Sequence, residues 1–212
     1  IGDPAWTEGP ANNDQSASAF RKAGIVMMYP ALRGGHENLG YQESFFGEVD
    51  DVLAAADFLA GQDFVDPPRI YLGGHSTGGT LALLAAECSD RFRAVFAFGP
   101  VEDLAGYGRE VLTFDLTNAR ELELREPGRW LHSIRNHVFV FEGTRQGNIA
   151  SLNAMAKSST NPLVHFHPVN GADHFSLLAP VTRLTANKIL GDTGSSCGIT
   201  FTETELSGSL KK

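Results

Sequence analysis

A serine set between glycines is the first residue in this sequence that could do chemistry. Ser76 stands in the segment GHSTG at 74–78, which has the form G-x-S-x-G and lies between two apolar runs. A strand that turns sharply into a helix at such a serine holds it in a strained conformation, and the flanking glycines let neighbouring backbone pass without Cβ clashes. The pattern predicts a nucleophile, and the alternative is a small residue in a glycine-rich turn.

The helix expected after Ser76 adds an electrostatic element to this segment. A helix N-terminus directs unpaired N–H groups and a partial positive charge at whatever lies in front of it. We therefore expect the backbone N–H of Thr77 to stabilise an oxyanion formed next to Ser76.

A serine nucleophile needs a base, and His174 is the strongest candidate. It lies between the last expected strand and the last expected helix, where a loop side chain emerges at the carboxyl edge of a parallel sheet. Ser76 opens from the same edge, so we expect the two side chains within hydrogen-bond reach, about 2.6 to 3.2 Å or looser without a ligand. The alternative is a loop histidine that caps the last helix.

The other histidines are weaker candidates for the base. His75 is next to the nucleophile, but its side chain is expected to point away from Ser76, and His36 lies in a loop that could line a pocket. The remaining ones are expected to be packing or surface residues, or to flank a strand entry at the opposite edge: His132, His137, His165 and His167.

The elements that must position these residues alternate regularly along the chain. The expected strands cover 23–30, 69–74, 92–100, 137–143 and 162–169, and the expected helices cover 45–61, 78–89, 148–159 and 175–190. Strands rich in Val, Ile and Phe with helices between them predict an α/β fold whose mostly parallel sheet carries helices on both faces. Residues 101–136 are expected to form an excursion over the sheet edge, and the tail 191–212 to wrap loosely.

Composition limits the classes of partner. The 212 residues, 42% of them hydrophobic, are enough for a single α/β domain over 1–212. A formal charge of −8 argues against nucleic acid and anionic membranes as partners. No stretch approaches the roughly 18 apolar residues of a membrane helix. We expect a soluble protein, and cytoplasmic is our expectation for its location although no signal in the sequence assigns one.

The cysteines and the glycine patterns give no sign of a metal or a cofactor. Cys88 and Cys197 lie far apart without a C-x-x-C spacing, which argues against a disulfide framework or a zinc site, and Cys88 is expected to be a buried thiol. The sequence has no phosphate-binding G-x-G-x-x-G or Walker loop and no ligand cluster, so we expect no cofactor.

Five segments carry a resemblance to a known family. They are PALRGG, GGHSTGG, GPVEDL, EPGRWLHSIRNHVFVFEGT and GADHFSLL, and they occur in the family's order. From about residue 20 to 190 the sequence resembles an α/β-hydrolase, and more narrowly the catalytic domain of the prolyl oligopeptidase and dienelactone hydrolase group of serine hydrolases. The resemblance implies a catalytic triad in the order Ser, acid, His, with Ser76 first and His174 last.

The acid of this triad departs from the family pattern. The relatives carry it a few residues after the strand at 137–143, in the place that Gln146 occupies here. A glutamine cannot supply the negative charge that stabilises an imidazolium. Glu142 at the end of that strand, Asp103 after the preceding strand, or no acid at all are the alternatives. We favour Glu142.

A second departure concerns the beginning of the chain. The relatives have an earlier strand that ends in a His-Gly-Gly type segment and supplies the second oxyanion donor, and residues 1–10 lack it. We expect a chain truncated at its N-terminus, with an incomplete oxyanion hole and with apolar surface exposed near 23–30.

These observations together favour a serine hydrolase. Ser76 would attack an ester or amide carbonyl, as in an esterase or a prolyl-oligopeptidase-like peptidase, with His174 as general base and a small ester or peptide as substrate. The alternative is a non-catalytic hydrolase scaffold that binds a small molecule or a protein.

Overall fold

A parallel sheet forms the centre of the molecule. The computed structural model describes residues 17–35, 38–104, 107 and 112–211. Its four-stranded sheet has the order β1-β2-β3-β4, and every neighbouring pair is parallel. The strands are β1 (Leu72–His75), β2 (Ala94–Phe98), β3 (His137–Gly143) and β4 (Val164–Val169). The predicted α/β fold with a parallel sheet is confirmed.

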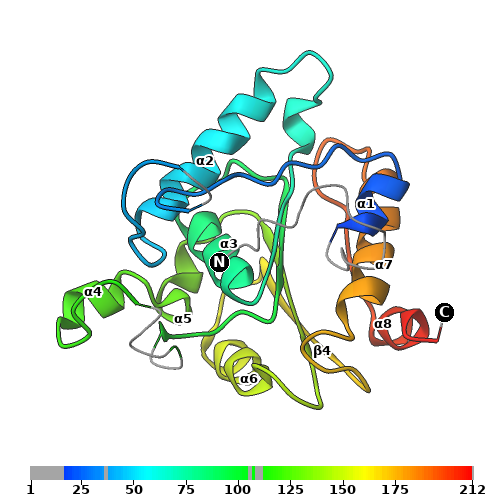
Figure 1. Cartoon of the computed structure of the whole chain (residues 1–212). Helices are drawn as coiled ribbons and strands as arrows, with labels where there is room; N and C mark the ends of the chain where they lie inside the picture. Colours follow the sequence, from blue (N-terminus) through cyan, green and yellow to red (C-terminus); the bar gives the residue numbers. More distant parts are fainter. Residues whose placement is uncertain (1–16, 36–37, 105–106, 108–111, 212) are drawn as a thin grey trace.

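Helices cover both faces of this sheet (Figure 1). One face carries α2 (Gly47–Ala60), α3 (Thr77–Cys88) and α6 (Ile149–Ser158). The other face carries α1 (Ser18–Lys22), α7 (Leu178–Gly191) and α8 (Glu203–Ser209). Two apolar clusters form because successive strand residues point to opposite faces. Val95 and Val138 belong to the first cluster, and Phe96 and Phe139 belong to the second.

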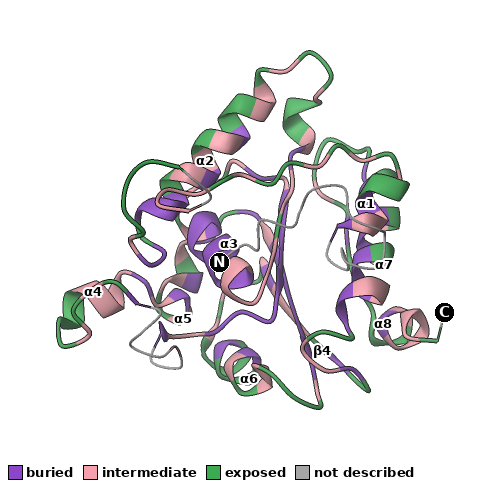
Figure 2. Ribbon diagram, viewed as in Figure 1, coloured by how far each residue is buried: buried purple, intermediate pink, exposed green. Residues whose placement is uncertain are grey.

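Helices α2 and α3 of the first face differ in burial. Helix α3 is buried along most of its length, whereas the far side of α2 is exposed (Figure 2).

Helix α2 begins two residues later than predicted, at Gly47, because Ser44 and Phe45 have φ angles of 52° and 76° and so cannot be helical.

The excursion over 101–136 contains short helical segments. They are α4 (Ala119–Glu123), α5 (Pro127–Trp130) and the 3₁₀ turn η3 (Leu131–Ser133), and another 3₁₀ turn, η1 (Pro67–Arg69), precedes β1. No helix in the described part of the chain combines the length and the apolar composition needed to cross a membrane.

The strand predicted over 23–30 is wrong. Residues 25–30 have no regular secondary structure and do not join the sheet. Ile25 and Met27 pack against the apolar cluster of α1 and α7, while Val26 is 57% exposed and Tyr29 is also exposed. The run was interpreted as buried on both sides because it is wholly apolar, but only one side is covered among the described residues. The predicted exposure of apolar side chains here is observed.

The C-terminal segment does not wrap loosely, contrary to the expectation for 191–212. Its apolar side chains Ile199, Phe201 and Leu206 are buried against α7 and the sheet. Arg93 forms an ion pair with the buried carboxylate of Asp192, at 2.6 Å, at the start of the segment. A few apolar residues spaced along a Gly-, Ser- and Thr-rich run are therefore enough to order it.

Cys88 corrects another expectation, because it is exposed rather than buried. It occupies the last position of α3, where the helix leaves the core. Cys88 and Cys197 are both free thiols.

Candidate active site

Ser76 occupies the sharp turn between β1 and α3. Its φ and ψ angles are 57° and −117°, and its backbone N–H donates a hydrogen bond to the Phe98 carbonyl at 2.8 Å. A Cβ on Gly74 would lie 2.1 Å from the Gly78 carbonyl oxygen, so the crossing of the chain on itself requires glycine. Ser76 therefore sits at the carboxyl edge of the sheet in a strained backbone conformation, as the motif predicts.

The first N–H of α3 is placed to bind a negative charge. Thr77 is the first residue of the helix, and its N–H donates to no acceptor in the part of the chain that the structure describes. The helix dipole adds a partial positive charge at this position. Residues 1–10, which lack the His-Gly-Gly type segment that supplies a second oxyanion donor in the relatives, lie outside the described residues.

Glu142 and His174 form a hydrogen-bonded pair at the same edge. Nδ1 of His174 lies 2.8 Å from Oε2 of Glu142, and because a carboxylate only accepts, the imidazole N–H donates. Glu142 is the last residue but one of strand β3, and His174 is in the loop between β4 and α7. The carboxylate side chain is 0% exposed and the imidazole 13% exposed, so water screens this interaction little.

Backbone groups satisfy the rest of the buried carboxylate. Gly143 N–H donates to Oε1 at 2.6 Å, and Asn148 N–H donates to Oε2 at 3.0 Å. The Asn148 side chain also donates to the Gly99 carbonyl at 2.7 Å. These donors offset the cost of burying a charge. Sequence reasoning missed Asn148, although it is the first residue of the helix predicted over 148–159 and asparagine is a common N-cap residue.

The other acid positions that were weighed do not contact His174. Gln146 is exposed in the loop after β3. Asp103 lies in the loop after β2, where it contributes to the electrostatic environment of Arg129. Of the three positions, only Glu142 reaches the imidazole.

Ser76 and His174 share an edge of the sheet but not a hydrogen bond. Ser76 N–H bonds Phe98, and the next residue, Gly99, faces the imidazole so closely that a Cβ there would lie 2.4 Å from His174 Cε1. Within the described residues, Ser76 Oγ makes no hydrogen bond with His174. The hydrogen bond expected between these two side chains is therefore not formed in this structure. Catalytic hydrogen bonds of this kind are often long without substrate and tighten when it binds.

His75 contacts the candidate base. Its Nε2 lies 2.9 Å from the backbone oxygen of His174, and the two ring centroids are 4.5 Å apart. Burial, followed by the nearby His174, lowers the pKa of His75 below its ordinary value. The side chain of His75 contacts the candidate base, which the sequence alone did not indicate.

The remaining histidines take no part in this cluster. His36 lies outside the described residues, and His132 is exposed. His137 and His165 contact one another through Nδ1 and Nε2 at 3.0 Å, and His167 stacks on Phe141. These three belong to strands β3 and β4 and act in packing.

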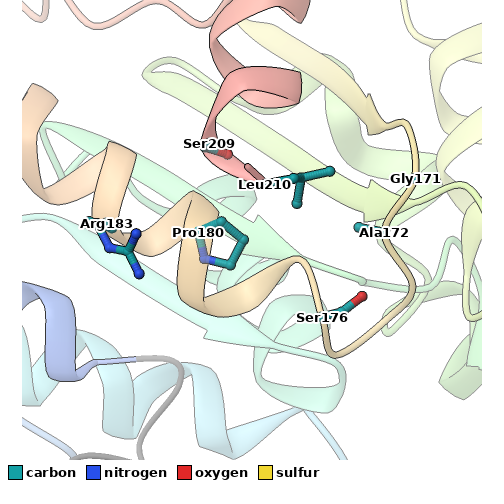
Figure 3. Close-up of a pocket in the computed structure, with 7 residues that line it drawn as sticks. All are labelled: Gly171, Ala172, Ser176, Pro180, Arg183, Ser209 and Leu210. Atoms are coloured by element: carbon teal, nitrogen blue, oxygen red, sulfur yellow. The ribbon is translucent and has the colours of Figure 1, made fainter. Parts of the chain in front are cut away.

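A cavity lies behind the loop that carries His174 (Figure 3). Its volume is about 280 Å³, and it is enclosed by the loop at 171–176, by α7 and by the end of α8. Among the described residues, Arg183 is its only charged lining residue, and Ser76, Glu142 and His174 do not line it. In the described part of the chain, no group of three or more His, Cys, Asp or Glu residues is placed to hold a metal ion.

Comparison with known proteins identifies a family for this chain. A model of the prolyl oligopeptidase family matches residues 11–135, more than half of the chain. Among solved structures, an esterase of Pyrococcus furiosus superposes with a TM-score of 0.64 at 17% identity, covering 87% of this chain and 75% of the esterase.

Two larger enzymes show the same fold over part of their length. A puromycin-hydrolysing peptidase of Mycobacterium tuberculosis has a TM-score of 0.58 at 22% identity and covers 69% of this chain. Dipeptidyl peptidase 4 of Porphyromonas gingivalis has a TM-score of 0.61 at 19% identity and covers 71%. The chain spans about a quarter of each of these proteins, 25% and 23% respectively. At these identities the likeness establishes the α/β-hydrolase fold.

Proposed function

The chain belongs to the prolyl oligopeptidase family of serine hydrolases, and from this premise we propose that it cleaves an ester or amide bond through an acyl-enzyme on Ser76. The observation that carries the proposal is the 2.8 Å hydrogen bond between Glu142 and His174, at the sheet edge from which Ser76 opens. A buried acid that orients a histidine beside a serine on a strand-to-helix turn is the arrangement that serine hydrolysis needs.

The first half of the reaction forms the acyl-enzyme. With its Nδ1 proton donated to Glu142, His174 has the Nε2 lone pair free to accept the proton of the Ser76 hydroxyl. The Ser76 oxygen then bonds to the carbonyl carbon, and the carbonyl oxygen becomes an oxyanion that the Thr77 N–H stabilises. His174 returns the proton to the leaving alcohol or amine as the bond to the carbonyl carbon breaks.

The second half repeats these steps with water. His174 accepts a proton from a water molecule whose oxygen attacks the ester carbon, and Ser76 leaves with that proton. Throughout both halves Glu142 stays ionised, fixes the tautomer of His174 and stabilises the imidazolium. We propose a small-molecule ester or a peptide as substrate, since esterases and peptidases both occur among the similar proteins.

Fluorophosphonate labelling tests this function directly, because the reagent forms a covalent bond only with an activated serine. The chain should be labelled with a stoichiometry near one, with the adduct on Ser76, and Ser76→Ala should abolish the labelling. His174→Ala should also lose most of the labelling, because the base is removed. His132→Ala, a change at an exposed histidine remote from the site, is the matched control for this variant. An unlabelled wild-type protein with intact folding would assign the chain to non-catalytic binding instead. A p-nitrophenyl ester and a peptide anilide, compared on unlabelled protein from the same preparation, then distinguish esterase from peptidase.

A further inference from the structure

His75 joins the segment that carries the nucleophile to the loop that carries the base. It is the last residue of β1, directly before Ser76, and its Nε2 is 2.9 Å from the carbonyl oxygen of His174, a residue 99 positions later. Its ring also packs against the imidazole of His174, with centroids 4.5 Å apart and planes at 42°. No step of the reaction above uses this side chain.

The hydrogen-bond partner of His75 identifies which of its ring nitrogens carries a proton. A carbonyl oxygen only accepts, so Nε2 of His75 carries the proton and donates it. Burial lowers the pKa of His75, and the neighbouring His174 lowers it further. A neutral ring therefore faces the imidazole on which positive charge develops during proton transfer, and the two rings do not repel one another.

The loop around His174 is also held by local contacts and by the segment after β3, where the Arg145 N–H donates to the Ala172 carbonyl at 3.1 Å. The Asp173 carboxylate accepts hydrogen bonds from the N–H groups of Phe175 and Ser176, at 3.0 and 2.9 Å. Phe175 packs edge-on against both histidine rings and remains exposed on its outer side. Glu142 holds the imidazole from the side of β3, while His75 holds the His174 backbone from the side of β1.

We propose that His75 is a positioning residue, whose Nε2–H holds the His174 backbone so that the imidazole stays between Glu142 and Ser76. This inference rests on the proposed function for its kinetic consequences, but not for its structural ones. His75 touches the base rather than the substrate, so its loss should lower kcat and the labelling rate while leaving KM almost unchanged.

A matched set of substitutions separates the donor from the ring. His75→Gln keeps an N–H donor but loses the ring. His75→Leu has a side chain of similar length without a donor, and His75→Phe keeps a ring without the donor. We expect fluorophosphonate labelling to slow roughly ten-fold or more in the Leu and Phe variants, because a hydrogen bond that orients a catalytic group is lost. The Gln variant should label within a few-fold of wild type. His167→Phe, at a half-buried histidine of β4, is the control and should label as wild type.

The second readout does not depend on activity. The proton on Nδ1 of His174 is hydrogen-bonded to Glu142 and should give a downfield ¹H NMR signal, assigned by its loss in Glu142→Gln. This signal should broaden in His75→Leu and His75→Phe and return in His75→Gln. Circular dichroism and thermal unfolding identify any variant that fails to fold. If either His75→Leu or His75→Phe fails to fold, the other serves as the variant without a donor.

The outcomes separate the two proposals. If wild type is labelled and all three variants label at its rate, or if Gln and Leu lose the same amount, His75 has no role as a donor. If Phe retains the wild-type rate while Leu does not, the ring alone matters and the proposal is overturned. If wild type is not labelled, the proposed function fails, and the NMR signal alone decides whether His75 positions His174.

Discussion

The Glu142 carboxylate reaches Nδ1 of His174 across the end of two neighbouring parallel strands, with Oε2 and Nδ1 2.8 Å apart. Glu142 is the last residue but one of β3, and β4 leads directly into the loop that carries His174. The relatives described by sequence resemblance place their acid later, in the loop position that Gln146 occupies here. A side chain one methylene longer than aspartate, starting from within the strand, thus meets the imidazole from a buried position.

Substituting Glu142 should therefore impair hydrolysis far more than substituting the other candidate. Glu142→Gln keeps the size of the side chain but removes the charge and the control of the tautomer. In a serine protease the analogous change costs about ten-thousand-fold in kcat. Asp103→Asn, at a carboxylate for which no contact with His174 is observed, should change kcat less than about three-fold. Steady-state hydrolysis of a p-nitrophenyl ester measures both. A large loss in Asp103→Asn with little change in Glu142→Gln would move the acid to Asp103.

Ser76 and His174 should behave as one catalytic unit. Ser76→Ala and His174→Ala should each remove most turnover, because neither the nucleophile nor the base works without the other. The double variant should then be scarcely slower than either single variant. Measuring kcat for all four proteins tests this. If the two losses multiply, each residue contributes on its own and the pairing is wrong.

The sequence predicted the elements of the site better than its contacts. The serine motif and the strand-to-helix change around Ser76 are local features, and the position of His174 follows from the rule that loops at the carboxyl edge of a parallel sheet converge. The contact between His75 and His174 joins two segments far apart in the chain, and no local pattern encodes it. Glu142 could be placed at a strand end but not distinguished from Asp103, because reach across two strands depends on their register.

The segments at the two ends of the described chain were the least predictable. Apolar content alone cannot tell whether one or both sides of a segment are covered, so the pattern predicts a buried strand over 23–30 although Val26 and Tyr29 are exposed. The C-terminal segment 191–212 is rich in Gly, Ser and Thr, which predicts a loose tail, but its apolar side chains are buried. Its order depends on Phe201 and Leu206 finding apolar partners on α7 and β3, which are distant in sequence.

A methyl group at Gly99 should disturb the pair of Glu142 and His174. Its Cβ would lie 2.4 Å from His174 Cε1 and 2.8 Å from Glu142 Oε2, at a φ of +61°. Gly24→Ala is the matched control, since its φ is +77° and nothing lies within 4 Å of the added Cβ. Both changes should lower the free energy of unfolding by about 1 kcal/mol or more through backbone strain. Only Gly99→Ala should also slow fluorophosphonate labelling, by ten-fold or more.

Equal labelling rates in these two glycine variants would show that the close approach of Gly99 to the imidazole is relieved without consequence. Denaturant unfolding must accompany the labelling experiment, because it measures the strain that the two variants share. A Gly99→Ala protein that is folded yet slow to label gives the expected result.

Acid sensitivity of stability should depend on His167. Burial lowers the pKa of His167 to about 4, with a further contribution from His165. Its Nε2 is buried and has no hydrogen-bond partner among the described residues. An unfolded chain protonates this histidine near its ordinary pKa of about 6.5, whereas the folded protein resists protonation until a lower pH. The stability contributed by neutral His167 is therefore fully present above about pH 6.5 and is lost as the pH falls toward 4.

The variant His167→Phe should remove that dependence. A shift of one pKa unit corresponds to about 1.4 kcal/mol, so this histidine alone can account for a loss of up to about 3 kcal/mol in the free energy of unfolding across this range. Phenylalanine keeps the stacking on Phe141 and Phe201 without a group that binds protons. Denaturant unfolding at several pH values between 4.5 and 7.5 should give a steeper decline for wild type than for the variant. His75 and His165 titrate in both proteins, so the difference reports His167 together with its coupling to His165. Parallel declines would mean that His167 takes up a proton in the folded state as readily as in the unfolded chain, and that its burial has no energetic consequence.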